Sequence, residues 1–161
     1  MAVGINNPGD FFPVAGIKLA AAKSGIRYQD RLDVVLIELA ENSKIAGVFT
    51  QNAFCAAPVT VAKTHLQSHF SRYFLINTGN ANAGTGESGK LNALLCCELT
   101  ASLGEVSVEQ VLPFSTGVIG EQLPVEKITG ALPKLFKNLD AENWKEAAWG
   151  ILTTDTRPKL V

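Results

Sequence analysis

The sequence has 161 residues, a length that suits one domain with a hydrophobic core. Hydrophobic residues make up 47% and charged residues 18% of it, and the formal net charge is -1. The chain therefore has neither the composition of a disordered protein nor the positive charge typical of nucleic-acid binding. No run of residues has membrane-spanning length, and the N-terminus lacks a secretion signal pattern. These features predict a single-domain, cytoplasmic protein, residues 1–161, that binds neither nucleic acid nor membranes.

The cysteines and histidines offer little for disulfides or metal ions. Cys55, Cys96 and Cys97 are odd in number and two of them are adjacent, which argues against a disulfide framework. His65 and His69 stand four residues apart and could share a helix face, but no third ligand lies near them in the sequence. We therefore expect buried thiols, no metal ion and no cofactor.

Short β-branched runs predict strands in the first half of the chain. Residues 32–40 and 45–50 are two such runs separated by ENSK, a pattern typical of a hairpin. Residues 59–70 have a mixed pattern that indicates a strand turning into a helix, and residues 72–77 predict another buried strand.

The second half begins with the most clearly predicted helix. Residues 90–104 contain good helix formers, and Gly104 is placed to be the first residue after the helix. Ser107 and Gln110 match a capping box, and residues 111–120 read as an extended segment.

Two more helices are predicted toward the end. A helix over residues 125–139 is expected to break or restart at Gly130 and Pro133. Asp140 is placed to cap a final helix over residues 141–152. Strands interspersed with helices, without regular alternation, predict a layered domain of mixed α and β structure.

The glycine-rich segment GTGESGK raises a nucleotide-binding hypothesis. Gly84, Gly89 and Lys90 stand at the spacing of a phosphate-binding P-loop. Such a loop needs a strand directly before it and a Ser or Thr after the lysine, whereas the predicted strand ends well before Gly84 and Leu91 follows Lys90. We therefore interpret residues 77–89 as support for a different site and keep a nucleotide-binding module as an alternative.

Two other polar loops carry groups suited to a site. In FSTGVIGE, Thr116 supplies a hydroxyl and Gly117 an unobstructed backbone N–H, so the pair could present two donors to a developing oxyanion. A plain strand-to-helix turn is the alternative. TTDT at residues 153–156 offers three hydroxyls and a carboxylate, which could hold the polar ends of an amino acid or bond to the loop itself.

Four motifs in this order resemble the ornithine acetyltransferase (glutamate N-acetyltransferase) family. They are AGVFTQNAFCAAPV at 46–59, INTGNANAGTGESG at 76–89, STGVIGE at 115–121 and TTDTRPK at 153–159. The similarity runs from residue 16 almost to the end, and the sequence resembles the α-chain portion of that family. The resemblance implies a layered α/β/β/α sandwich related to self-processing aminopeptidases.

The resemblance also implies an acyltransferase of arginine biosynthesis. Such an enzyme moves acetyl from N-acetylornithine to glutamate, and some members also use acetyl-CoA. The family precursor cleaves itself before a threonine, which becomes the nucleophile of a separate β chain. The resemblance therefore implies no nucleophile in this chain, an α2β2 heterotetramer, and no activity without the β chain.

By the same resemblance, Thr116 and Gly117 match the oxyanion hole, as hydroxyl and backbone N–H donors respectively. Thr153 and Thr154 match the family's substrate-contacting threonine motif; Thr154 is favoured, and Thr153 stays open. A non-catalytic interaction fragment of the same lineage is the remaining alternative.

Overall fold

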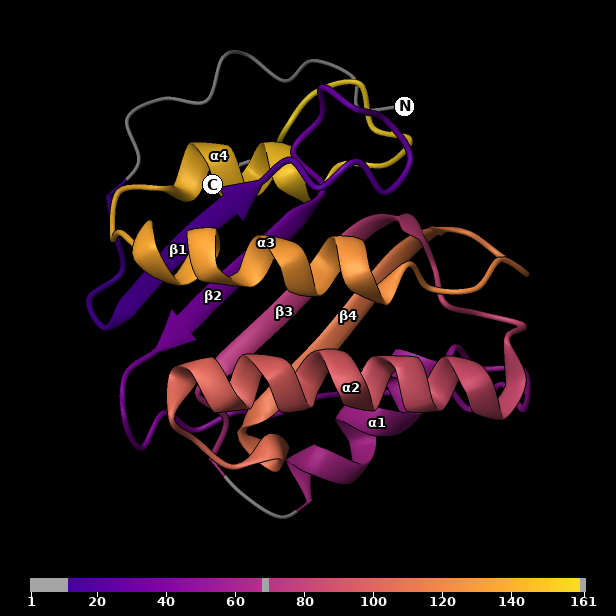
Figure 1. The fold of residues 1–161 in the computed structure, drawn as a ribbon. Helices are drawn as coiled ribbons and strands as arrows, with labels where there is room; N and C mark the ends of the chain where they lie inside the picture. Colours follow the sequence, from indigo (N-terminus) through magenta and orange to yellow (C-terminus); the bar gives the residue numbers. More distant parts are fainter. Residues whose placement is uncertain (1–11, 68–69, 160–161) are drawn as a thin grey trace.

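The computed structural model describes residues 12–67 and 70–159, which form a four-stranded sheet with helices packed on it (Figure 1). The strands are β1 (Ile17–Ala22), β2 (Val34–Leu39), β3 (Tyr73–Asn80) and β4 (Val111–Val118), and they lie in this order across the sheet. β2 is antiparallel to both β1 and β3, whereas β3 and β4 are parallel. The helices are α1 (Ala57–Leu66), α2 (Gly86–Gly104), α3 (Val125–Lys137) and α4 (Trp144–Gly150), and a short 3-10 helix, η1 (Val108–Gln110), precedes β4. The structure is thus mixed α and β, as predicted.

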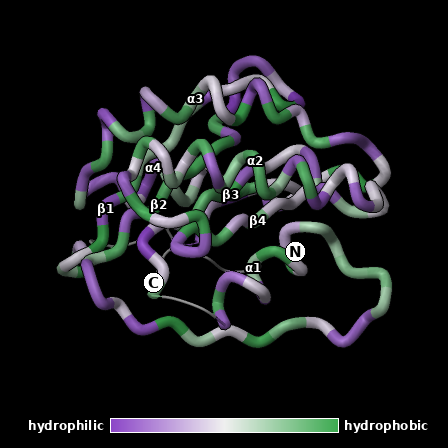
Figure 2. The backbone as a smooth tube through the Cα atoms, turned by 60° about the horizontal axis from the view of Figure 1, so that its bottom comes forward, coloured by the Kyte–Doolittle hydropathy of each residue, from purple (hydrophilic) through white to green (hydrophobic). Residues whose placement is uncertain are grey.

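The main core lies between the sheet and the helices α2 and α3, which cover one of its faces (Figure 1). Successive side chains of a strand point to opposite faces, so alternate strand residues enter this core. Its members include Val34, Leu36, Leu75 and Val111 from the strands and Cys97, Leu132 and Leu135 from the helices. Hydrophobic and hydrophilic residues alternate along α3 in Figure 2, as expected for a helix with one face on the core.

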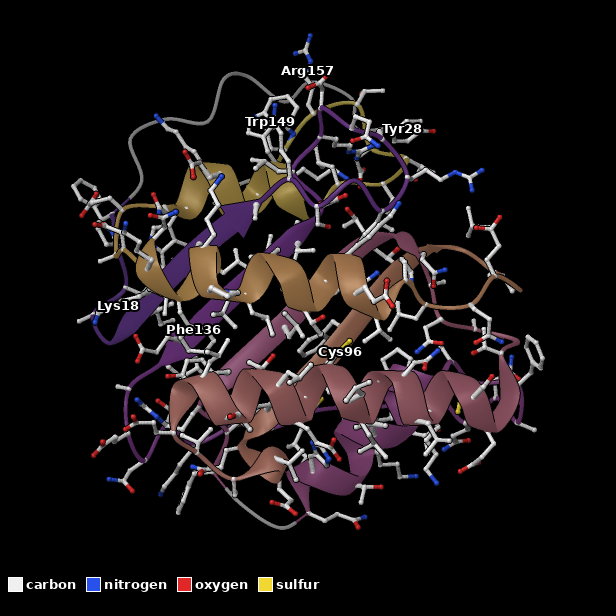
Figure 3. All side chains as sticks on the ribbon, viewed as in Figure 1. Lys18, Tyr28, Cys96, Phe136, Trp149 and Arg157 are labelled. Atoms are coloured by element: carbon white, nitrogen blue, oxygen red, sulfur yellow. The ribbon has the colours of Figure 1, made fainter. Side chains whose placement is uncertain are left out.

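The buried cysteines belong to this core. Cys96 points from α2 into the space between α2 and α3 (Figure 3), and Cys97 is fully buried. Burial raises the pKa of the Cys96 thiol to about 12, because a thiolate would lose its hydration there. All three cysteines are free, and Cys55 is exposed.

The opposite face of the sheet is only partly covered. There α4 packs over β1 and β2, in a small cluster that contains Leu19, Val35 and Ala147. Farther along this face, the rings of Phe74 in β3 and Phe114 in β4 meet edge to face at 5.3 Å, and Phe114 is 41% exposed. Among the described residues, this face is therefore apolar over β3 and β4 and is left partly uncovered around Phe114, although Leu112 is buried.

The predicted hairpin between residues 32–40 and 45–50 is wrong. Residues 34–39 form β2, but residues 45–50 form no strand. The neighbours of β2 are β1 and β3, so both of its hydrogen-bonding edges are occupied and the later run cannot pair with it. The sequence did not point to β1 because its alanine-rich stretch, IKLAAA, has weak strand propensity.

Two predictions about helix ends also need correction. Helix α2 starts earlier than predicted, at Gly86, and it contains Gly104; the left-handed residue after it is Glu105, with φ of 54°. Gly104 is required for packing instead, since a Cβ there would collide with the Tyr73 ring. The Ser107–Gln110 capping box is confirmed around η1.

Helix α3 is continuous, so the break predicted at Gly130 and Pro133 is wrong. Ile128, Leu132 and Leu135 are buried on its core face, and this packing outweighs the lost backbone hydrogen bond at the proline.

Asp140 does not cap the last helix, which begins later than predicted, after Asn143. The Asp140 backbone instead exchanges hydrogen bonds of 2.9 and 3.0 Å with the backbone of Leu19 in β1. The Asp140 carboxylate accepts the Glu142 N–H at 2.8 Å. In the part of the chain that the structure describes, no helix has the length and apolar character to cross a membrane.

Candidate functional site

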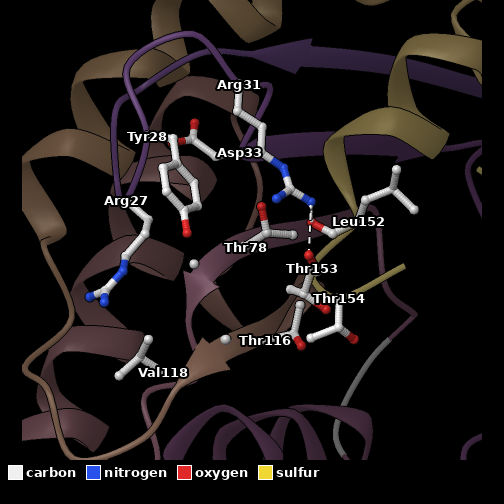
Figure 4. Close-up of a pocket in the computed structure, with 12 residues that line it drawn as sticks. Arg27, Tyr28, Arg31, Asp33, Thr78, Thr116, Val118, Leu152, Thr153 and Thr154 are labelled. Atoms are coloured by element: carbon white, nitrogen blue, oxygen red, sulfur yellow. Dashed lines mark hydrogen bonds between the residues drawn. The ribbon is translucent and has the colours of Figure 1, made fainter. Parts of the chain in front are cut away.

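A pocket of about 480 Å³ lies at the carboxyl ends of β3 and β4 (Figure 4). Thr116, Gly117, Thr153 and Thr154, the residues singled out by sequence, all line it. Its remaining walls come from Arg27, Tyr28, Arg31, Asp33, Thr78, Gly79, Val118 and Leu152. The fold thus brings segments far apart in the chain to one cavity.

The end of β4 presents Thr116 and Gly117 to this cavity. Among the described residues, no group hydrogen-bonds to the Thr116 hydroxyl, so the hydroxyl is available to a ligand. Gly117 has φ of 136°, and a Cβ there would lie 2.6 Å from the Asn80 backbone nitrogen, so only glycine fits without moving β3. The β3–β4 register shifts beside Gly79 and Asn80, a β-bulge that reshapes the strand ends at the pocket.

Asparagine side chains hold the segment that follows β3. The Asn80 amide donates to the carbonyl oxygens of Glu121 and Gln122 at 3.2 and 3.1 Å, which ties β3 to the chain beyond β4. The Asn82 amide donates to the Gly89 carbonyl at 2.8 Å, and its oxygen accepts the Thr85 hydroxyl at 2.9 Å. These bonds agree with the interpretation that residues 77–89 support the neighbouring pocket.

Lys90 is placed away from the pocket and forms an ion pair with Glu87 at 3.7 Å. We expect Lys90→Ala to leave nucleotide affinity unchanged, because the wild-type chain should have no P-loop to lose. Calorimetric titration of both proteins with ATP and Mg²⁺ checks this. Micromolar ATP binding that disappears in the variant would restore the nucleotide-binding alternative.

The loop between β1 and β2 carries pocket residues that the sequence interpretation missed. Arg27, Tyr28 and Arg31 all belong to the stretch RYQDRLD, and Tyr28 points into the cavity in Figure 4. A cluster of charged residues beside a strand is usual in solvated loops, so the pattern alone did not indicate a site. Arg27 also forms an ion pair with Glu121 at 3.3 Å.

Asp33 organises this loop from its buried position at the start of β2. The Ser24 N–H and hydroxyl donate to Oδ1 at 2.6 and 2.9 Å, and the Ile26 N–H donates to Oδ2 at 2.7 Å. The Asp33 carbonyl also accepts the Thr78 N–H at 2.9 Å, which connects the loop to β3.

Asp33→Ala should lower the free energy of unfolding by about 2 to 4 kcal/mol, because it removes charge-assisted hydrogen bonds and leaves buried donors unpaired. Urea denaturation measures the change. Asp30→Ala is the matched control in the same loop, since the Asp30 side chain is exposed and its ion pair with Lys23 is long, at 3.9 Å. A comparable loss in both variants would contradict the role given to Asp33.

The structure gives no support for a metal site at His65 and His69. The ring Nδ1 of buried His65 lies 2.7 Å from the Val111 carbonyl oxygen, and His69 is outside the described residues. Within residues 12–67 and 70–159, no three His, Cys, Asp or Glu side chains gather where they could hold a metal ion.

A sequence model of the ArgJ family matches residues 18–161. The arginine biosynthesis bifunctional protein ArgJ of Methylococcus capsulatus is 56% identical over 147 residues, which are 91% of this chain and 36% of that protein. The protein of the same name from Pseudomonas syringae is 54% identical over 159 residues, 99% of this chain and 39% of that protein. The chain therefore spans less than two-fifths of the length of these curated relatives.

Two crystal structures share the fold. ArgJ of Bacillus halodurans superposes with a TM-score of 0.83 at 30% identity, covering 89% of this chain and 75% of that chain. Ornithine acetyltransferase of Mycobacterium tuberculosis, in complex with ornithine, superposes with a TM-score of 0.85 at 32% identity, covering 91% and 79%. The predicted fold of the ornithine acetyltransferase type is confirmed.

Proposed function

Because the chain belongs to the ArgJ family, we propose that it is the α chain of a glutamate N-acetyltransferase of arginine biosynthesis. In this proposal, residues 1–161 form one domain of a cytoplasmic enzyme that transfers acetyl from N-acetylornithine to glutamate without a cofactor. The observation that carries the proposal is that Thr116, Gly117, Thr153 and Thr154 all line the same pocket.

The proposed reaction has two steps and uses a threonine at the N-terminus of the β chain. The hydroxyl of this threonine attacks the acetyl carbonyl of N-acetylornithine and gives its proton to the N-terminal amine of the β chain. The resulting oxyanion accepts hydrogen bonds from the Thr116 hydroxyl and the Gly117 N–H. Collapse breaks the C–N bond, and ornithine leaves with the proton. The amine of glutamate then attacks the acetyl-threonine ester, the ester C–O bond breaks, and the amine proton passes through the terminal amine of the β chain to the threonine oxygen, which releases N-acetylglutamate.

The threonines after α4 suit the other end of the substrate. Thr153 and Thr154 line the pocket beside Thr116 (Figure 4), and neither hydroxyl has a hydrogen-bond partner among the described residues. In the proposal, one of them contacts the amino-acid part of N-acetylornithine. Thr154 is the favoured candidate because it is the more exposed of the two.

The open sheet face supports a β-chain partner. Ile37, Phe74 and Ile76 stay partly exposed although they lie on inner strands, and Phe114 is more exposed still. Apolar side chains on one sheet face are normally buried against a second layer. In the proposal the β chain supplies that layer, as the second sheet of the α/β/β/α sandwich, within an α2β2 assembly.

The lengths of the relatives are also consistent with a separate α chain. Residues of this chain cover 75% and 79% of the matched crystallographic chains, but only 36% and 39% of the two curated relatives. The crystallographic chains are thus much shorter than the curated sequences. Cleavage of a precursor into α and β chains would account for this difference.

The proposal is tested by producing the chain alone and together with a β chain that begins with threonine. We expect acetyl transfer from N-acetylornithine to glutamate only when both chains are present. Full activity of the isolated chain would refute the placement of the nucleophile on the partner. A parallel assay with acetyl-CoA shows whether it also serves as a donor, and failure of the two chains to associate would refute the shared sandwich.

A further inference from the structure

Arg31 makes contacts that neither the sequence motifs nor the proposed reaction uses. Its guanidinium Nη2 donates to the carbonyl oxygens of both Leu152 and Thr153, the latter at 3.3 Å. These two carbonyls belong to the segment that leads from α4 into the pocket. A residue from the β1–β2 loop thus holds a segment more than a hundred positions later in the chain.

Among the described residues, few contacts from outside α4 hold that segment, although the Leu152 N–H donates to the Trp149 carbonyl at 3.3 Å. The Thr78 hydroxyl donates to the Gly150 carbonyl at 3.2 Å, which ties the end of α4 to β3, and the Leu152 side chain is buried. Beyond Leu152 the described chain has no helix or strand. The orientation of Thr153 and Thr154 therefore depends on what holds the carbonyl groups of Leu152 and Thr153.

A guanidinium is well suited to this task. It is always charged, and the two hydrogens of Nη2 lie in fixed directions in the guanidinium plane, so this one nitrogen can donate to both carbonyl oxygens, whereas the hydrogens of a lysine ammonium rotate freely. Its charge also suits the carbonyl-rich end of a helix. Within the described residues Arg31 forms no ion pair, so no carboxylate draws the guanidinium away from these carbonyls.

We propose that Arg31 is a positioning residue for binding of the acetyl donor: it clamps residues 152 and 153 so that Thr153 and Thr154 face the pocket beside Thr116. This inference rests on the proposed function. It assigns part of the affinity for the acetyl donor to a residue of the β1–β2 loop, which carries none of the family motifs quoted above.

The test compares Arg31→Met with Arg72→Met in the assembly of the α and β chains. Arg72 is the matched control because its guanidinium also donates to a backbone carbonyl, that of Leu39, and it does not line the pocket. Arg31→Met should raise the KM for N-acetylornithine about tenfold or more, with kcat changed much less, since the lost charge-assisted bonds act on binding. Arg72→Met should lower thermal stability and leave this KM unchanged.

Two additional measurements separate positioning from a general loss of structure. Added methylguanidinium should partly restore the KM of Arg31→Ala, which leaves the site of the guanidinium empty, and the KM of Arg31→Lys should fall between those of Arg31→Met and the wild type. Hydrogen exchange at residues 150–156 should be faster in Arg31→Met than in Arg72→Met, whether or not acetyl transfer is assayed.

Each outcome decides a different question. An unchanged KM in Arg31→Met, or an equal rise in both variants, would overturn the positioning role. Unchanged exchange at residues 150–156 would overturn the clamp itself. Absence of acetyl transfer in the wild-type assembly would instead defeat the proposed function, while the exchange measurement would still decide whether Arg31 holds the segment.

Discussion

Thr116→Ala should lower kcat for acetyl transfer about a hundredfold or more, the usual cost of losing one oxyanion donor. The hydroxyl has no hydrogen-bond partner among the described residues, so its removal breaks no hydrogen bond between them. The loss should therefore appear in turnover and not in the free energy of unfolding. Steady-state kinetics of the α and β assembly, together with urea denaturation, measure both quantities.

Two control variants sharpen this prediction. Thr116→Ser keeps the hydroxyl and should retain most of the turnover, whereas Thr129→Ala removes a hydroxyl that bonds to the Val125 carbonyl within α3 and should not change kcat. If Thr116→Ala turned over within a few-fold of wild type, Thr116 would not be an oxyanion donor. The non-catalytic interaction fragment would then become the better explanation of the chain.

Gly117→Ala should lower the free energy of unfolding by about 3 kcal/mol or more, through strain and overlap together. The φ of 136° is unfavourable for any residue with a Cβ, and that atom would press on the backbone of Gly79 and Asn80. Backbone cannot rotate away as a side chain can, so β3 and β4 would have to separate. Because these strands form the floor of the pocket, acetyl transfer should fall as well.

Gly120→Ala is the control that separates backbone strain from steric overlap with β3. Gly120 also has a positive φ, 82°, but a Cβ there would meet nothing within 4 Å. This control should cost only the left-handed strain, about 1 to 2 kcal/mol. Urea denaturation of both variants measures the difference, and equal losses would show that the contact with β3 does not restrict position 117.

Local patterns carried some of the fold and of the candidate site. The β-branched runs of β2 and β3, the body of α2 and the Ser107–Gln110 box were predicted because each depends on residues close in sequence. The motif resemblance singled out Thr116, Gly117, Thr153 and Thr154, and the structure places all four at one pocket. Their chemical roles stay predictions until the variants are measured.

Other features depended on contacts between distant residues. One of the two partners of β2 is β1, a strand whose alanine-rich sequence has weak propensity, and the pairing follows from burial on both sheet faces. Helix α3 passes through Pro133 because its core contacts outweigh the local penalty. Gly104 is explained only by the Tyr73 ring that packs against it.

By itself the sequence determined β2, β3, the body of α2 and the Ser107–Gln110 box, together with the family that the motifs resemble. Only the tertiary structure showed that the β1–β2 loop reaches the pocket, that Asp33 holds this loop, and that Arg31 grips the segment after α4. The reason is physical: propensity and periodicity act over a few neighbouring residues, whereas the pocket is made by hydrogen bonds between segments that meet only once the sheet has formed.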